Sequence, residues 1–338
     1  EIVLEIGSEF WKVDNSTKKN HLFPSDTKWF LSGQNALNFI IDDIKSKHDV
    51  SSVALPSWCC DSMIIPFIIN DFDISFYDIE LKNGNLVQKI DKECDVILAM
   101  DYFGYESSYN LSNYNGIVIR DLTHSIFIKE YKDATYYFGS LRKWTGVYTG
   151  GYAWSNEKWT DEIPVREVDR KYVSLRCQAM KQKRDYIEGL TKSKGYLEKY
   201  EEAEDVLDEC NLKGVYNAER ADILAAQTLD IDKIKKKRRE NAKELLKSIS
   251  DIALFPEISD NDCPLFVPII IKCRDELKKT LIGKGVYCPV HWPISKHHIL
   301  TNRTREIYEK ELSIVCDQRY STEDMKKISC LIKEYMKK

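Results

Sequence analysis

The chain has 338 residues, of which 43% are hydrophobic and 31% are charged, as is typical of a globular protein. A formal net charge of −4 gives no electrostatic footprint for nucleic acid, and no apolar run approaches the roughly 20 residues needed to cross a bilayer. With no recognisable signal peptide, these features predict a cytoplasmic protein of one large domain and a smaller companion, with neither nucleic-acid nor membrane partners.

The ten cysteines include the adjacent pair Cys59 and Cys60 but no Cys-x-x-Cys motif. In a chain of this size, the pattern indicates reduced thiols rather than a disulfide framework or a zinc site. His291, His297 and His298 lie close together in sequence, yet no carboxylate or cysteine spacing around them supports a metal cluster. The sequence therefore predicts no metal site.

The first convincing helix follows Ser32 and begins with Gly33, Gln34 and Asn35, after an arm over residues 1–26. Its apolar positions fall near helical spacing and predict one buried face: Ala36, Leu37, Phe39, Ile40, Ile41 and Ile44. Small polar residues at such a start are either an ordinary N-cap or, through the free backbone amides, an anion-binding site.

Short apolar runs bounded by polar or glycine-containing turns predict the strands of a parallel sheet. They are Val53–Pro56, Ile74–Tyr77, Val96–Met100, Ile117–Ile119, Tyr136–Phe138 and Gly151–Trp154. Asp121 and His124 follow one of these runs in GIVIRDLTHS, so we expect them at the carboxyl end of a buried strand, where ligands bind in α/β sheets.

Lys143 stands between two predicted strands in YYFGSLRKWTGVYTGG. Burial lowers the pKa of a lysine, and the neutral amine can attack a carbonyl, so this position suits Schiff-base chemistry. The alternative is a surface lysine at the end of a strand.

The second half of the chain is mostly helical and charged, and residues 165–209 indicate solvated helix faces. Ile231–Leu246 is basic but has interleaved apolar residues, which favour one buried face over a nucleic-acid patch. Beyond it, the pattern predicts the strands Leu265–Ile271 and Val286–Val290 around a helix over Glu276–Gly283.

The Asp-x-x-His spacing of Asp121 and His124, and a lysine seven residues before Gly150, resemble the DegT/StrS-type nucleotide-sugar aminotransferases, which are fold-type I enzymes dependent on pyridoxal 5'-phosphate (PLP). This resemblance implies an α/β fold in which residues 1–230 form the N-terminal arm and a large PLP-binding domain with a mostly parallel seven-stranded sheet. Residues 231–338 would then form a linking helix and a small C-terminal α/β domain. The resemblance also implies a homodimer with shared active sites.

In this family the lysine carries PLP, an aspartate faces the pyridine nitrogen, and a small-residue helix start binds the phosphate. The resemblance therefore assigns these roles to Lys143, to Asp121 and to Gly33, Gln34 and Asn35. His124 is expected to bond the phenolic oxygen of the cofactor or to pack against its ring.

Other positions depart from the family pattern. The serine expected five residues before the lysine is Phe138, which leaves Ser140 or Arg142 as substitutes. The family's ring-stacking position falls on Cys60, although we prefer Trp58, for which the alternative is a core residue. Asn217 is the candidate that reaches the partner subunit's PLP phosphate, although strict spacing from the following motif lands two residues later.

His291 and Trp292 match a histidine–aromatic pair that lies near the substrate in the family. The resemblance thus implies transfer of an amino group from an amino acid, with glutamate expected, to a nucleotide-linked keto sugar, as in polysaccharide biosynthesis. Two alternatives remain: a PLP enzyme that acts on a non-sugar substrate, and a non-catalytic homologue with the same fold.

Overall fold

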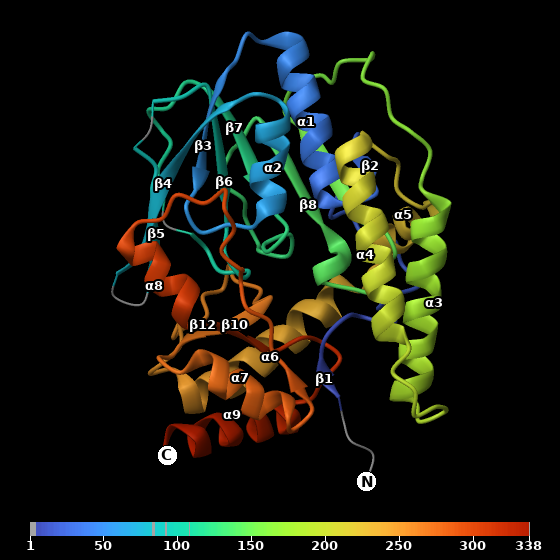
Figure 1. Ribbon diagram of the computed structural model, residues 1–338, viewed down its shortest axis with the longest axis vertical. Coiled ribbons are helices and arrows are strands. Elements are labelled where there is room, and N and C mark those ends of the chain that lie inside the picture. Colours follow the sequence, from blue (N-terminus) through green and yellow to red (C-terminus); the bar gives the residue numbers. More distant parts are fainter. Residues whose placement is uncertain (1–4, 83–84, 92, 108, 338) are drawn as a thin grey trace. The chain divides into compact units, whose positions relative to one another are not determined.

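The computed structural model describes residues 5–82, 85–91, 93–107 and 109–337 (Figure 1), so the first four residues of the expected arm lie outside it. The chain divides into two compact units. Unit 1 contains Glu9–Val50 and Ala134–Asp230, and unit 2 contains Glu5–Ser8, Ser51–Asp133 and Ile231–Lys338. The chain passes into unit 2 for the last time after Asp230, but the division into domains 1–230 and 231–338 stays a prediction.

Unit 1 combines three strands with long helices. Its elements are β2 (Lys28–Phe30), α1 (Gly33–Lys47), β8 (Tyr136–Ser140), a 3₁₀ turn (Leu141–Lys143), β9 (Gly151–Ser155), α3 (Arg170–Ile187), α4 (Tyr196–Lys213) and α5 (Arg220–Gln227). β9 pairs antiparallel with both β2 and β8. The tip of β8, with the lysine turn, is therefore tied through β9 to the strand that leads into α1.

The helices of unit 1 follow from their sequences. Ser32 caps α1 by accepting a hydrogen bond from the backbone N–H of Asn35, and the apolar face predicted for α1 is buried. α3 and α4 form a hairpin that is visible in Figure 1. Apolar residues such as Leu175 and Leu207 fill it. Most of its charged residues are exposed or half-buried as expected, but Arg176 and Lys183 are buried.

Unit 2 contains the parallel strands. Its first elements are β3 (Ser52–Pro56), α2 (Asp61–Ile69), β4 (Asp73–Lys82), β5 (Asn85–Lys89), β6 (Val96–Met100) and β7 (Ile117–Asp121). β3 pairs in parallel with β4 and β6, β6 pairs in parallel with β7, and β5 adds an antiparallel edge to β4. All five residues of β6 are buried, as expected for a strand covered on both faces.

The C-terminal segment of unit 2 builds a further core. Its elements are α6 (Ile231–Ile249), β10 (Phe266–Ile270), α7 (Arg274–Ile282), β11 (Val286–Tyr287), α8 (Asn302–Lys310), β12 (Glu311–Val315) and α9 (Thr322–Met336). β10 pairs antiparallel with β12, and β1 (Ile6–Gly7) adds in parallel to β11. Residues such as Leu245, Ile269 and Ile328 fill this core.

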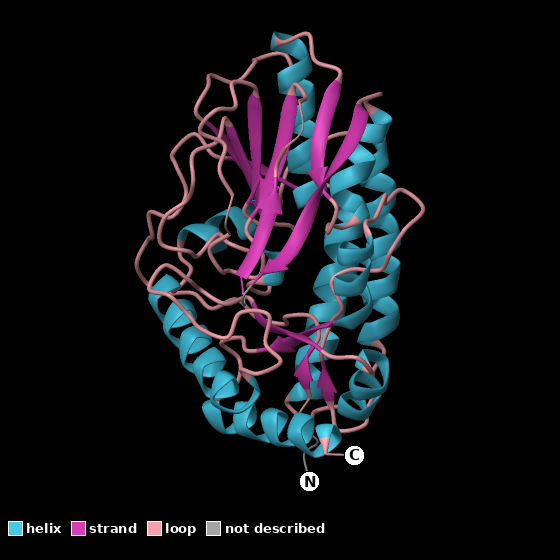
Figure 2. Cartoon of the chain, turned by 90° about the vertical axis from the view of Figure 1, so that its left-hand side faces the viewer, coloured by secondary structure: helices cyan, strands magenta, loops and turns pink. Residues whose placement is uncertain are grey.

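The predicted α/β class with a mostly parallel sheet is confirmed, and Figure 2 shows the strands in magenta among cyan helices. The strand count was wrong. The described strands of the large sheet are β2, β8 and β9 in unit 1 and β3, β4, β5, β6 and β7 in unit 2, which makes eight rather than seven. The number seven came from the family resemblance, and the apolar runs of the sequence predicted six of these strands without β2 and β5. Among the helices that the structure describes, none is long and apolar enough to span a membrane.

Candidate functional site

The lysine turn, defined as Leu141–Gly151, is a closed structure in unit 1. The backbone N–H of Leu141 donates to the carbonyl of Gly150 (2.9 Å), and that of Trp144 donates to the carbonyl of Leu141 (2.8 Å). The Trp144 side chain is fully buried, while Lys143 is half-buried. Lys143 is therefore presented from a packed turn and not from a mobile surface loop.

The two glycines that end this turn are required by its geometry. Gly150 has φ of +131°, a conformation that L side chains rarely adopt. A Cβ on Gly151 would lie 2.0 Å from the carbonyl oxygen of Ser32, so no side chain fits there. This close approach joins the end of the lysine turn to the residue that caps α1.

Asp222 in α5 holds the turn from its other side. Its carboxylate accepts hydrogen bonds from the backbone N–H of Thr149 (2.8 Å), the hydroxyl of Thr149 (2.7 Å) and the backbone N–H of Tyr148 (3.2 Å). Burial raises the pKa of Asp222, and the bonds from Thr149 oppose that rise. Thr149 is thus the partner of a carboxylate supplied by α5.

The start of α1 adjoins the lysine turn. A Cβ on Gly33 would lie 3.3 Å from the Cβ of Ser140, so this glycine and this half-buried serine are immediate neighbours. Gln34 is also half-buried. Gly33, Gln34 and Ser140 therefore surround one place at the N-terminus of a 15-residue helix, where backbone N–H groups favour an anion.

Asn35 is already engaged in bonds within unit 1. Its side-chain amide donates to Asn211 (2.8 Å), its side-chain oxygen accepts from the backbone N–H of Tyr216 (2.6 Å), and its own backbone N–H donates to Ser32 (3.0 Å). A cofactor contact by Asn35 would cost one of these buried bonds, so Gly33 and Gln34 are the better phosphate ligands.

Arg142 turns into an ion cluster with the α3–α4 hairpin. It pairs with Glu204, and the buried Arg176 lies 3.1 Å from Glu9 and 3.6 Å from Glu204. Burial alone would raise the pKa of Glu9, but Arg176 and Arg142 lower it to about 2. Of the two substitutes for the family serine, Ser140 is therefore the one beside the helix start, whereas Arg142 is occupied by Glu204.

Asn217 is exposed on the surface of unit 1, and its backbone N–H donates to the carbonyl of Arg166 (2.9 Å). Its contact with a cofactor of a partner subunit stays a prediction.

In unit 2, Asp121 is the last residue of β7, as the motif predicts. It is 4% exposed, and its carboxylate accepts a hydrogen bond from the backbone N–H of Thr123 (2.7 Å). His124 is 1% exposed and accepts from the backbone N–H of Phe103 through Nδ1 (3.4 Å). Both side chains are thus held at the carboxyl end of a parallel strand.

An aromatic cluster surrounds His124, and its members come from four separate segments of unit 2. It consists of Trp58, Tyr102, Phe103, His124, His291 and Trp292. The ring of Trp292 stacks on His124 with centroids 5.4 Å apart, and His291 meets the edge of His124 at 5.3 Å. The structure therefore brings the predicted substrate pair into contact with the predicted cofactor residue His124.

The two candidates for ring stacking differ in surroundings. Trp58 is fully buried, stacks on Tyr102 with centroids 4.9 Å apart, and donates its indole N–H to the carbonyl of His291 (2.6 Å). Cys60 is half-buried, with its sulfur 2.8 Å from the hydroxyl of Ser62. Trp58 belongs to the cluster of His124, but one of its faces is covered, as the core-residue alternative requires.

The sequence did not point to Tyr102, Phe103, Glu311 or Ser313 as site residues. Tyr102 and Phe103 follow a buried strand at the same end as Asp121, which was an available signal. Glu311 and Ser313 alternate with apolar residues in ELSIV, a pattern typical of a strand with a solvated face. Both are in fact fully buried.

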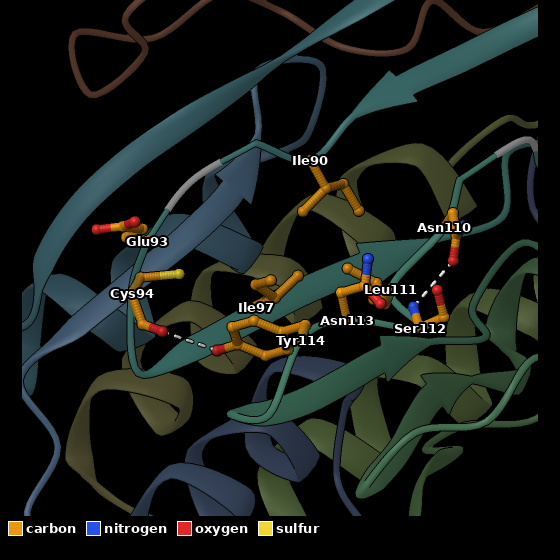
Figure 3. Close-up of a pocket in the computed structure, with 9 residues that line it drawn as sticks. All are labelled: Ile90, Glu93, Cys94, Ile97, Asn110, Leu111, Ser112, Asn113 and Tyr114. Atoms are coloured by element: carbon orange, nitrogen blue, oxygen red, sulfur yellow. Dashed lines mark hydrogen bonds between the residues drawn. The ribbon is translucent and has the colours of Figure 1, made fainter.

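Unit 2 also has a hollow of about 490 Å³ near residues 90–97 and 110–114 (Figure 3). The hydroxyl of Tyr114 donates to the carbonyl of Cys94 there (2.9 Å). The hollow lies at the amino end of β6 and contains none of the predicted site residues, so it is not the candidate cofactor site. Within the described residues, no group of histidine, cysteine and acidic side chains could hold a metal ion.

The sequence and the structure were compared with those of known proteins. No protein-family model and no curated protein matches the sequence. Solved structures do match: a DegT/DnrJ/EryC1/StrS aminotransferase from Brucella abortus is 15% identical with a TM-score of 0.61, covering 94% of this chain and 86% of that one. DesI, solved in the presence of its TDP-sugar product, is 12% identical with a TM-score of 0.60, over 90% and 79% of the two chains.

A third match is Spr1654 from Streptococcus pneumoniae in its PLP form, at 12% identity and a TM-score of 0.58 over 91% of this chain and 87% of that one. At such identities the likeness establishes the fold alone. The chain therefore has the fold of the DegT/DnrJ/EryC1/StrS aminotransferases, in agreement with the resemblance that its motifs suggest.

Proposed function

We propose that this protein is a PLP-dependent aminotransferase that moves an amino group from an amino acid, with glutamate as the expected donor, to a nucleotide-linked keto sugar. The observation that carries the proposal is Lys143, held half-buried on a closed turn beside the amide-rich start of α1. Two of the matched proteins support it, since one was solved in a PLP form and the other with a TDP-sugar product.

The residues present fit this cofactor. Because Gly33 has no side chain, its backbone and that of Gln34 can approach a phosphate, which the hydroxyl of Ser140 can also bind. Lys143 would supply the amine that holds the cofactor aldehyde, and the buried carboxylate of Asp121 would supply the negative charge for a protonated pyridine nitrogen. When bound, PLP provides an electron sink for the substrate carbon that loses its proton.

The chain's own side chains then perform the remaining work. Lys143 would take the proton from the donor carbon as a general base and return it as a general acid. The carboxylate of Asp121 would face the pyridine nitrogen and favour its protonated form. His124, held by Phe103 and covered by Trp292, positions the ring and excludes water.

A sugar is favoured over a simple keto acid because the arginines in or beside the sequence motifs, which are the candidates for binding a substrate carboxylate, are already paired. The three candidate arginines each have an internal acidic partner: Arg120 pairs with Asp101, Arg142 with Glu204, and Arg319 with Asp317. His291 and Trp292 instead provide hydrogen-bonding and aromatic surface suited to a sugar. Transamination of a non-sugar substrate and a non-catalytic role are the outcomes that the experiments below would reveal.

Purified protein should be yellow, and borohydride should fix the cofactor irreversibly on Lys143. Peptide mapping of the reduced protein checks this, with Lys143→Ala as the variant and Lys158→Ala, at an exposed position, as the matched control. Adduct on another lysine, or none, would contradict the cofactor assignment.

The substrate class is tested by a half-reaction. The enzyme is loaded with pyridoxamine phosphate and mixed separately with nucleotide keto-sugars and with simple keto acids, while the absorbance of the PLP form is followed. Keto-sugars should restore it faster. If only keto acids restore the absorbance of the PLP form, the proposal of a sugar substrate is wrong, while the assignment of PLP as the cofactor stands.

We further propose a cytoplasmic homodimer in which Asn217 reaches the cofactor phosphate of the partner subunit. Mixing Lys143→Ala with Asn217→Ala should then create mixed dimers with one intact site, and activity should rise above that of either variant alone. Activity that stays at the sum of the separate variants would place Asn217 outside the shared site.

A further inference from the structure

Glu311 and Ser313 lie on the face of β12 that the sequence pattern predicts to be solvated. Leu312 and Ile314 point into the C-terminal core, so the alternating residues Glu311 and Ser313 lie on the opposite face. Neither is solvent-exposed, although a glutamate is rarely fully buried unless it has partners. Its partners lead directly to the aromatic cluster.

A chain of hydrogen bonds connects Glu311 with His291. The hydroxyl of Ser313 donates to Oε1 of Glu311, and the backbone N–H of His291 donates to Oε2 (2.8 Å). Nδ1 of His291 lies 2.8 Å from the same Ser313 hydroxyl. The His291 ring in turn meets His124 at 5.3 Å and Trp292 at 5.2 Å. One buried carboxyl is thus linked to both predicted substrate and cofactor residues.

The serine has a single proton, and this sets the protonation of the imidazole. When Glu311 is ionised, Ser313 donates to it, so Nδ1 of His291 must carry the proton that bonds to Ser313, and Nε2 is left as an acceptor. When Glu311 is protonated on Oε1, it donates to Ser313, whose own proton turns toward Nδ1. Nε2 then carries the proton and becomes a donor.

The proton balance of this change is simple. Glu311 gains one proton from solvent, and Ser313 keeps its one proton and rotates it. The imidazole releases a proton from Nδ1 and takes one up at Nε2, and therefore stays neutral with one proton throughout.

The charges around Glu311 allow it to be protonated near neutral pH. Burial raises its pKa to about 8, although Ser313, His291, Arg274 and Lys278 lower it. Arg274 and Lys278 approach from α7, and the buried thiol of Cys288 lies on the segment that leads to His291. The basic groups favour the ionised form, and burial opposes them.

We propose that Glu311 is a positioning residue that selects, through Ser313, the tautomer of His291 and so decides whether Nε2 donates or accepts a hydrogen bond beside His124. The consequence for the reaction rests on the proposed function, whereas the tautomer switch does not. The carbonyl oxygen of a keto sugar only accepts hydrogen bonds, so we expect the Nε2–H tautomer to be the one that binds such a substrate.

The switch can be observed by NMR on protein labelled with ¹⁵N-histidine, because the two neutral tautomers and the imidazolium give different ring-nitrogen shifts. His291→Gln assigns the signal by its loss. Wild type should show Nε2–H at pH 6.5 and Nδ1–H at pH 9.5. Glu311→Gln should show Nε2–H at both, since the amide of glutamine donates to Ser313 as a protonated carboxyl does. Ser313→Ala should abolish the change with pH.

The control is Glu306→Gln, which removes an exposed carboxylate of α8 that pairs with Lys310, and it should switch like wild type. Any of three results would overturn the proposal: one tautomer at both pH values in wild type, an imidazolium at pH 6.5, or a full switch in Glu311→Gln.

A kinetic measurement tests the consequence for turnover. Between pH 6.5 and pH 9.5, the KM for the keto-sugar should rise about tenfold in wild type and should not rise in Glu311→Gln. The change in kcat with pH should be the same in both proteins.

The two proposals fail separately. A tautomer switch in a protein that takes up no PLP would refute the proposed function and leave the role of Glu311 standing. A yellow enzyme that aminates keto-sugars, but in which His291 keeps one tautomer at both pH values, would refute the role of Glu311 and leave the proposed function standing.

Discussion

The lysine turn and the aromatic cluster are built in different ways. The turn is one continuous stretch, closed by its own backbone hydrogen bonds and by glycines that no other residue could replace. The cluster draws Trp58, His124 and Trp292 from distant parts of the sequence and holds them by ring packing and by bonds to the backbone.

This difference shows how the demands on the two regions diverge. A residue that carries a cofactor covalently needs a rigid local mount, which a short motif can encode. A surface that must match a substrate is assembled from several elements, so it can change residue by residue while the fold persists. Removing chemistry from the turn should therefore have larger effects than altering the support of the cluster.

Lys143→Ala should produce the largest effect. Loss of the amine removes both the covalent attachment and the group that moves the proton, so turnover should fall by roughly 10³-fold or more. Measured turnover with saturating PLP checks this, with Lys158→Ala as the control. A fall of less than tenfold would mean that the turn is not the catalytic mount.

Asp121→Ala removes the carboxylate that we propose to face the pyridine nitrogen and leaves the proposed phosphate contacts at the start of α1 in place. Turnover should fall by roughly 10² to 10³-fold, as expected for loss of one preorganised charge, while PLP still binds. Cofactor absorbance and turnover are measured on the same sample. Near-normal turnover would show that the end of β7 has no role in the reaction.

Glu311→Gln tests the support of the cluster through stability. The carboxyl of Glu311 has a pKa of about 8 in the fold against an ordinary value of 4.5, so the folded state binds the extra proton between these pH values. Its contribution to stability is therefore present below about pH 4.5 and is lost as the pH rises to about 8, at about 1.4 kcal/mol per pH unit.

Urea unfolding at several pH values should show that the free energy of unfolding of wild type declines between about pH 4.5 and pH 8. In Glu311→Gln, the slope of this decline should be smaller by about 1.4 kcal/mol per pH unit. Glu306→Gln serves again as the control. Parallel pH profiles for wild type and Glu311→Gln would mean that Glu311 is ionised throughout.

Asp222→Asn weakens the clamp on the lysine turn. The amide offers one acceptor in place of a carboxylate that takes three hydrogen bonds, so the free energy of unfolding should fall by about 1–3 kcal/mol. Thr149→Val, which removes only the hydroxyl, should lose about 1 kcal/mol. Thermal or urea unfolding measures both. If Asp222→Asn costs no more than Thr149→Val, the backbone bonds to Asp222 do not hold the turn.

The sequence by itself determined where many of the regular elements lie. Helical spacing from Ala36 to Ile44 located α1, and continuous apolar runs located the buried strands, because these patterns depend only on the geometry of one element. The turn that contains Lys143 and ends at Gly150 and Gly151 could be located in the same way, because it is one continuous stretch of sequence. Asp121 at the end of β7 followed from the rule that polar residues after a buried strand lie at its carboxyl end.

Only the tertiary structure decided which polar groups are occupied. In the sequence, Asn35 and Arg142 both resemble phosphate ligands. In the structure, the side chain of Asn35 is hydrogen-bonded to Asn211 and Tyr216, and Arg142 pairs with Glu204. Glu311 resembles a surface residue in its alternating strand, yet it is buried against His291. Burial and hydrogen bonding depend on residues from other elements, and their free-energy cost or gain has no signature in the local sequence.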